Sequence, residues 1–127
     1  MKKDQIKPTE SEFEILSIIW EQGPCTVRFI NDKLNEKREV GYTTTLKIMQ
    51  IMADKKLLTR NTESRTHIYD TSIVEEKMQK QLLKKFVDTA FRGSAMNLVV
   101  QALGNHKTSK EELEEIKLLI EKIEKKK

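Results

Sequence analysis

Residues 42–70 read YTTTLKIMQIMADKKLLTRNTESRTHIYD, and this stretch decides the fold. From residue 42 to residue 57, apolar side chains recur at helical spacing, which predicts a helix. One side of that helix carries Thr45, Ile48, Met49, Met52 and Lys56. Two short runs of β-favouring residues follow, 57–61 and 66–70, on either side of a polar turn. We therefore expect a helix followed directly by a β-hairpin.

The opposite side of this expected helix carries Thr43, Lys47 and Gln50, with Thr44 and Leu46 on its flanks. Small polar side chains and long donors suit a helix in the major groove of DNA, where base edges offer acceptors, donors and thymine methyl groups. A surface helix that faces only water would show the same pattern. Residues 40–69 hold five basic residues against two acidic ones, and this excess favours a nucleic-acid partner.

Two shorter helices are expected upstream of this stretch. Thr9, with Glu12 three residues later, is typical of a capping box at a helix start, and Gly23 ends the apolar run that follows. Thr26 can cap a second helix, whose apolar stripe is formed by Val27, Ile30 and Leu34. Three short helices followed by a basic hairpin are the order of a winged helix-turn-helix, in which the hairpin contacts a phosphate or the minor groove.

The chain after residue 71 is expected to be helical to its end. A long fourth helix closes at Gly93, a short apolar fifth helix spans residues 94–103 with Gly104-Asn105 as a left-handed cap, and Ser109 with Glu112 opens a sixth. About 55 residues in three amphipathic helices cannot readily hide their apolar surface alone. The alternative is that these helices fold back onto the N-terminal domain. We expect a second copy to cover them, through Phe86, Phe91, Leu98, Val99, Leu103, Ile116 and Ile120.

The predicted fold class is mainly α with a small β-hairpin wing. Residues 1–71 are expected to form a winged helix-turn-helix DNA-binding domain, and residues 72–127 a three-helix dimerisation domain. The net charge of +4 allows a polyanionic partner. No stretch approaches the roughly 18 apolar residues of a membrane span, so we expect a cytoplasmic protein.

Three other functions compete with DNA binding. An enzyme would need a base held against a nucleophile, but His67, His106 and Cys25 fall on separate predicted elements and no glycine-rich phosphate loop appears, so we expect neither catalysis nor a cofactor. A metal sensor using the two histidines lacks a cysteine or carboxylate at ligand spacing. A winged helix used for protein contact is the third, and it would not show the steep salt dependence of DNA binding.

Four stretches resemble the penicillinase-repressor family, in the right order over nearly the whole chain. They are residues 12–28, with EFEIL, IW, GP and TVR; residues 42–69, with YTT, LTR and RTHIY; residues 91–99, with FRGSA and LV; and Glu112-Leu113. The resemblance implies a winged-helix transcriptional repressor that acts as a homodimer on double-stranded operator DNA. Members repress genes for antibiotic resistance, copper handling or other stress responses.

The resemblance places Thr43, Thr44 and Arg65 at the DNA surface. The predicted DNA-binding residues are Thr26, Arg28, Tyr42, Thr43, Thr44, Lys47, Gln50, Arg60 and Arg65. Lys47 and Ile51 stand where many members carry threonine and arginine, and Lys56 and Ser64 replace common glycines before and within the wing. Operator preference is therefore expected to differ from that of many members.

The resemblance also bears on how repression ends. Antibiotic-responsive members are inactivated by proteolysis at an Asn-Phe bond in the fifth helix, and the matching pair here is Gln101 and Ala102. The resemblance thus suggests a membrane sensor-protease as a partner. We expect release by a protease of altered specificity or by another inducer, and not by an Asn-Phe-directed protease. The copper-responsive branch carries a C-terminal cysteine cluster, which is missing from this tail, so we expect a different branch.

Overall fold

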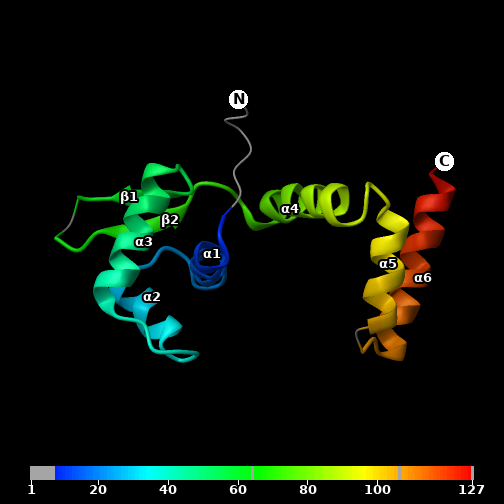
Figure 1. Cartoon of the computed structure of the whole chain (residues 1–127), viewed down its shortest axis with the longest axis horizontal. Helices are drawn as coiled ribbons and strands as arrows, with labels where there is room; N and C mark the ends of the chain where they lie inside the picture. Colours follow the sequence, from blue (N-terminus) through cyan, green and yellow to red (C-terminus); the bar gives the residue numbers. More distant parts are fainter. Residues whose placement is uncertain (1–7, 64, 106, 127) are drawn as a thin grey trace. The chain divides into compact units, whose positions relative to one another are not determined.

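The computed structural model describes residues 8–63, 65–105 and 107–126, and these form helices and one hairpin (Figure 1). The elements in order are α1 (Glu10–Gln22), α2 (Val27–Leu34), α3 (Tyr42–Asp54), β1 (Leu58–Asn61), β2 (Ile68–Thr71), α4 (Glu75–Ala90), α5 (Ala95–Asn105) and α6 (Lys110–Lys125). The mainly α fold with a β-hairpin wing is thereby confirmed. The chain divides into two compact units, one ending at Leu82 and the next beginning at Leu83.

Helix α1 begins and ends as its sequence predicts. The Thr9 hydroxyl accepts a hydrogen bond from the Glu12 amide, 3.1 Å, and the Glu12 carboxylate accepts one from the Thr9 amide, 2.9 Å. These two bonds satisfy amides that the first turn of a helix leaves without partners. At the other end, Gly23 has φ 91°, a left-handed conformation that costs glycine little.

The first unit has a closed apolar core between α1, α2, α3 and the hairpin. The indole Nε1 of Trp20 donates to the Ile73 carbonyl oxygen, 3.0 Å, and joins α1 to the segment before α4. The start of α4 contributes Met78, which is fully buried. The buried apolar residues are Ile15, Leu16, Ile19, Cys25, Val27, Ile30, Leu34, Met49, Met52, Leu57, Leu58, Tyr69 and Met78.

The wing is an antiparallel pair whose register runs from Leu58 opposite Thr71 to Asn61 opposite Ile68. Its strands begin one and two residues later than predicted, so the connection between them is longer than the expected four-residue turn. Cys25 makes an isolated bridge with Tyr69: its amide donates to the Tyr69 carbonyl, 3.0 Å, and its carbonyl accepts from the Tyr69 amide, 2.8 Å. The base of the wing is therefore tied to the segment that precedes α2.

Helix α3 is shorter than predicted at its C-terminal end. It stops at Asp54, Lys55 is its C-cap, and Lys56 takes φ 69°. The prediction that Lys56 lies on the apolar side of the helix was wrong, because this left-handed residue turns the chain out of the helix and into β1. A left-handed backbone favours glycine, which gives a physical reason for the glycine that the resemblance expects at this position.

In the second unit, α4 ends in a turn where Arg92 has φ 51° and Gly93 has φ 83°, as the predicted stop at Gly93 requires. The predicted left-handed cap at Gly104-Asn105 was wrong, since both residues belong to α5 and neither has a positive φ. The Ser109 and Glu112 capping box at the start of α6 is confirmed. Among its described residues, this unit buries no side chain.

Candidate nucleic-acid interface

Asn31 of α2 and the C-cap of this helix, Asn35, hold the turn that leads into α3. The side-chain nitrogen of Asn31 lies 3.0 Å from the Val40 carbonyl oxygen, 3.2 Å from the Gly41 carbonyl oxygen and 2.8 Å from the Thr45 hydroxyl. One turn later, Asn35 donates to the same Val40 oxygen, 2.8 Å, and accepts from the Val40 amide, 3.0 Å. Because Gly41 offers no side chain to cap α3, this asparagine clamp is what defines the start of the helix.

The asparagine clamp was missed at the level of sequence. Asn31 is 7% exposed and Thr45 is completely buried, so the polar contact between them lies inside the core. Buried polar groups in native proteins are normally hydrogen-bonded, and none of the described buried side-chain nitrogen or oxygen atoms lacks a partner. The available signal was the spacing of Asn31 and Asn35, which places both on one side of α2.

Helix α3 turns its polar side outward. Thr45, Met49 and Met52 are fully buried, whereas the predicted readout residues all lie on the exposed side. These exposed residues are Tyr42, Thr43, Thr44, Lys47 and Gln50. Their exposure on one face makes them available to a base edge together, and their contact with DNA stays a prediction.

A hollow of about 350 Å³ separates the wing from the starts of α2 and α3. Four of the predicted DNA-binding residues line it: Thr26, Arg28, Tyr42 and Arg65, together with Val27, Leu46, Thr66, His67 and Tyr69. The Arg28 guanidinium lies 5.0 Å from the centre of the Tyr42 ring, close enough for a cation–π contact. The lining of the hollow thus includes two arginines beside the exposed face of α3, and arginine side chains suit a phosphate group.

Two predicted DNA-binding residues differ from the others, one in its role and one in its place. Thr26 is the N-cap of α2, and its hydroxyl accepts from the Phe29 amide, 3.1 Å, so this side chain has a structural role. Arg60 lies on β1 opposite Tyr69 and is exposed, but it does not line the hollow. Its place on the strand allows contact with a different part of a DNA backbone.

The positive charge of the interface is smaller than the sequence count suggests. The Lys55 ammonium lies 2.8 and 2.9 Å from the carboxylate oxygens of Glu12, whose residue is 5% exposed. Lys55 therefore neutralises a buried carboxylate and links the start of α1 to the end of α3. Of the five basic residues counted over 40–69, this one is committed to the fold.

A second ion pair lies at the far end of α2. Arg38 donates to both carboxylate oxygens of Glu14, 2.7 and 2.9 Å. This hydrogen bonding, with the Arg38 charge, lowers the pKa of Glu14, and the Glu14 carboxylate raises the pKa of Arg38. The pair joins α1 to the loop after α2 and does not contribute to the DNA-facing hollow.

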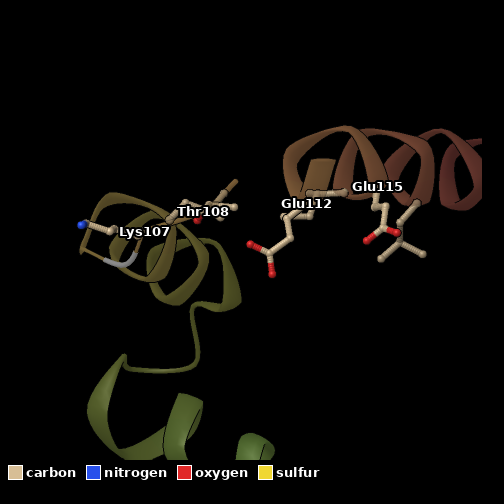
Figure 2. A pocket seen from close by; sticks show the side chains of 7 residues that line it. Lys107, Thr108, Glu112 and Glu115 are labelled. Atoms are coloured by element: carbon tan, nitrogen blue, oxygen red, sulfur yellow. The ribbon is translucent and has the colours of Figure 1, made fainter. Parts of the chain in front are cut away.

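The predicted dimerisation residues lie in the second unit, exposed or half-buried. Phe86, Val99, Leu103 and Ile120 are exposed, and Phe91, Leu98 and Ile116 are half-buried. Phe86 and Phe91 form an edge-to-face pair with ring centres 5.5 Å apart. A groove of about 500 Å³ lies between the end of α5 and the start of α6, with Glu112 and Glu115 on its α6 side (Figure 2).

The predicted cleavage pair lies on an exposed part of α5. Gln101 accepts a hydrogen bond from the Asn105 side chain, 3.2 Å, and Ala102 follows it within the helix. A protease needs an extended strand in its active site, so cleavage here would require local unwinding of α5.

The residues of the competing functions do not come together. Cys25 is buried in the core, its thiol donates to the Gly23 carbonyl, 2.9 Å, and burial raises the pKa of this thiol. His67 lines the hollow beside the wing, and His106 lies outside the described residues. The part of the chain that the structure describes contains no group of three metal-ligating side chains and no helix long and apolar enough to cross a membrane.

The three-helix core, the exposed α3 and the adjoining wing define a winged helix-turn-helix protein. Comparison with known protein families shows to which of them the chain belongs. The penicillinase repressor family model matches residues 8–122, and the chain therefore belongs to this family of transcriptional repressors, as the sequence resemblance predicted. The family name describes repressors and not enzymes.

The curated relatives are nearly as long as this chain, and their sequences are distant from it. The chain is 21% identical to a penicillinase repressor of Staphylococcus aureus over 126 residues, which cover 99% of this chain and all of the relative. It is 19% identical to the methicillin resistance regulatory protein MecI of Mammaliicoccus sciuri over 90% of this chain and 93% of the relative. A MecI protein of Staphylococcus aureus is 18% identical over the same shares.

Proposed function

We propose that this protein is a sequence-specific DNA-binding repressor that acts as a homodimer on a palindromic operator. The observation that carries the proposal is the exposed polar face of α3, whose start is held by the asparagine clamp and whose flank adjoins the arginine-lined hollow. A rigid helix with outward donors beside a cationic hollow is what simultaneous contact with base edges and phosphates requires.

The two kinds of contact fall on different residues. Thr43, Lys47 and Gln50 face the bases, where lysine and glutamine side chains can hydrogen-bond guanine and adenine. Arg28 and Arg65, which line the hollow, bind the phosphate backbone, and Arg60 contacts it from β1. Backbone contacts orient the protein on the duplex, and the base contacts supply sequence preference.

The second copy is proposed from the apolar surface of the second unit. Seven of the eleven residues of α5 are apolar, on a wide arc whose opposite side carries Asn97 and Gln101. A helix with so wide an apolar surface is normally buried. Along α6, a single stripe contains Leu113, Ile116, Leu119, Ile120 and Ile123, and most of these side chains are exposed.

Twofold pairing of these helices would bury both surfaces and present two copies of α3 to one duplex. A twofold dimer uses the same patch on each subunit, and its two readers meet matching half-sites one or two helical turns apart. The operator is therefore expected to be a palindrome. The functional boundary is proposed to lie after residue 71, with the DNA-reading elements before it and the pairing helices after it, and the start of α4 packs into the core of the first unit through Met78.

The regulated gene is proposed to serve resistance or a stress response, because the relatives are named for penicillinase and for methicillin resistance. Operator DNA lies in the bacterial cytoplasm, so the protein is proposed to work there. We further propose that a membrane sensor-protease of altered specificity, or another inducer, relieves repression, since Gln101 and Ala102 replace the Asn-Phe pair of the resemblance.

The test is selection of DNA fragments from a random duplex pool by the purified full-length chain. We expect a palindromic sequence to be enriched, and its binding to weaken with salt at a log-log slope of about −0.9 per neutralised phosphate. Sedimentation at micromolar concentration should show a dimer. Binding without sequence enrichment, or an affinity that does not depend on salt, would contradict the proposal and favour a protein-contact role for the winged helix.

A further inference from the structure

Ile51 is a large aliphatic side chain on the otherwise polar exposed face of α3. It is 43% exposed, although this helix buries Thr45, Met49 and Met52 completely on its other side. Residues four apart on a helix are surface neighbours, so Ile51 follows Lys47 by one turn on the same face. At about 100° per residue, it also lies nearer the centre of the exposed face than Thr44 does.

We propose that Ile51 is a specificity-determining residue that packs against the 5-methyl group of a thymine in the major groove. This inference rests on the proposed function, since it needs α3 to lie in that groove. The thymine methyl is the apolar group on the major-groove edges of the base pairs, where the other positions present hydrogen-bond donors and acceptors. An aliphatic side chain leaves such polar groups without a partner, so it favours thymine over the other bases.

The residues around Ile51 extend this readout. Lys47 is a pure donor and suits the O6 and N7 acceptors of guanine, and Gln50 can pair with the N6 and N7 positions of adenine. Both are exposed on the face that carries Ile51. The three side chains together predict a half-site in which a thymine lies within a few base pairs of a purine that Lys47 or Gln50 contacts.

The test uses duplexes recovered by selection with the wild-type chain, in which each thymine in turn is replaced by deoxyuridine. Deoxyuridine differs from thymidine only by the missing methyl group. We expect one position in each half-site where the replacement weakens wild-type binding about fourfold, the effect of losing one buried methyl group. Ile51→Ala should bind the thymine duplex as weakly as the wild type binds the uridine duplex, and should not respond to the replacement.

Val74→Ala is the matched control, because it truncates a β-branched side chain that is 67% exposed and lies outside α3. It should retain the full response to deoxyuridine, and thermal unfolding should show that both variants fold. A wild-type chain indifferent to the methyl group at every thymine, or an Ile51→Ala variant with an unchanged response, would overturn the inference while the repressor function stands. Failure to enrich any sequence would contradict the proposed function itself, and this inference with it.

Discussion

The two units of this chain differ in how they use apolar residues. The first has a closed core, in which residues from Ile15 to Met78 are buried. The second also carries apolar stripes on its helices, yet the structure describes no buried side chain from Leu83 onward. Burial of apolar surface is the main favourable term in folding. The first unit has such burial within its own core, whereas in the second unit the proposed second copy would supply it.

The largest effect is expected from a charge on the exposed apolar stripe of α6. This substitution tests whether the second unit pairs with a second copy through that stripe. Ile120→Asp removes no contact within the chain's own core, because Ile120 is 51% exposed. In a dimer it would place a carboxylate in an apolar interface, so we expect a monomer. Operator affinity should then fall about 100-fold or more, as two linked readers become one.

Leu118→Asp is the matched control for this experiment. Leu118 is 63% exposed on the same helix, but helical spacing places it opposite the stripe. Sedimentation should find the control dimeric and Ile120→Asp monomeric at equal concentration. If both variants remain dimers, the stripe is not the pairing surface.

A second prediction tests whether the first unit is held together by its own polar contacts. Asn31→Ala removes the donor from the Val40 and Gly41 carbonyls and from the buried Thr45 hydroxyl. The Asn35 side chain and the Thr45 amide still donate to those two carbonyls, but the Thr45 hydroxyl loses its Asn31 contact inside the core, so the free energy of unfolding should fall by about 1–3 kcal/mol. Urea unfolding followed by circular dichroism measures it.

Asn97→Ala, at an exposed position of α5, provides the control and should change stability little. Asn31→Ala should also lose preference for operator over random DNA, because the start of α3 is no longer defined. Unchanged stability and preference would show that the asparagine clamp does not position the helix.

A third prediction separates the two sets of contacts within the first unit. Lys47→Ala should relax preference at particular operator positions, by about 1–3 kcal/mol for a good base contact. Arg65→Ala should instead weaken binding to all sequences and reduce the salt slope by about one. Titration of operator and random duplexes at several salt concentrations measures both effects, and equal losses on both duplexes for each variant would show that α3 does not read sequence.

The smallest expected effect is local to the turn before the wing. Lys56 has φ 69°, and a left-handed backbone costs a non-glycine residue about 1 kcal/mol or more. Lys56→Gly should therefore stabilise the first unit by about 0.5–1 kcal/mol, after the entropy that glycine adds to the unfolded chain. Thermal unfolding would detect the increase.

The neighbouring Lys55→Gly substitution supplies the contrast. Lys55 has φ −81° and pairs with the buried Glu12, so glycine there should destabilise the protein. A stabilising Lys55→Gly, or a destabilising Lys56→Gly, would contradict the conformations assigned to this turn.

Much of the architecture was predictable because its signals are local. The capping boxes at Thr9 and Ser109 and the stop at Gly93 depend on residues within one or two turns, where backbone amides and dihedral angles are satisfied by near neighbours. The apolar face of α3 follows from periodicity alone. The predicted ends of α3, at Lys56, and of α5, at Gly104, were wrong. At each of these positions one residue adopts either a helical or a left-handed backbone, and neighbouring contacts decide between them.

Tertiary structure decided the contacts that join residues far apart in the chain. In the sequence, Asn31 and Lys55 look like ordinary polar residues. In the structure, Asn31 lies in the core against Thr45, and Lys55 neutralises Glu12, which is 43 residues away in the sequence. The hollow beside the wing exists because the loop bearing Arg65 and the start of α2 bearing Arg28 meet in space. Local sequence determines which face of a helix is apolar. The contact partner of a side chain, its exposure and the net charge of a surface depend on which elements pack together, and that packing is a property of the whole fold.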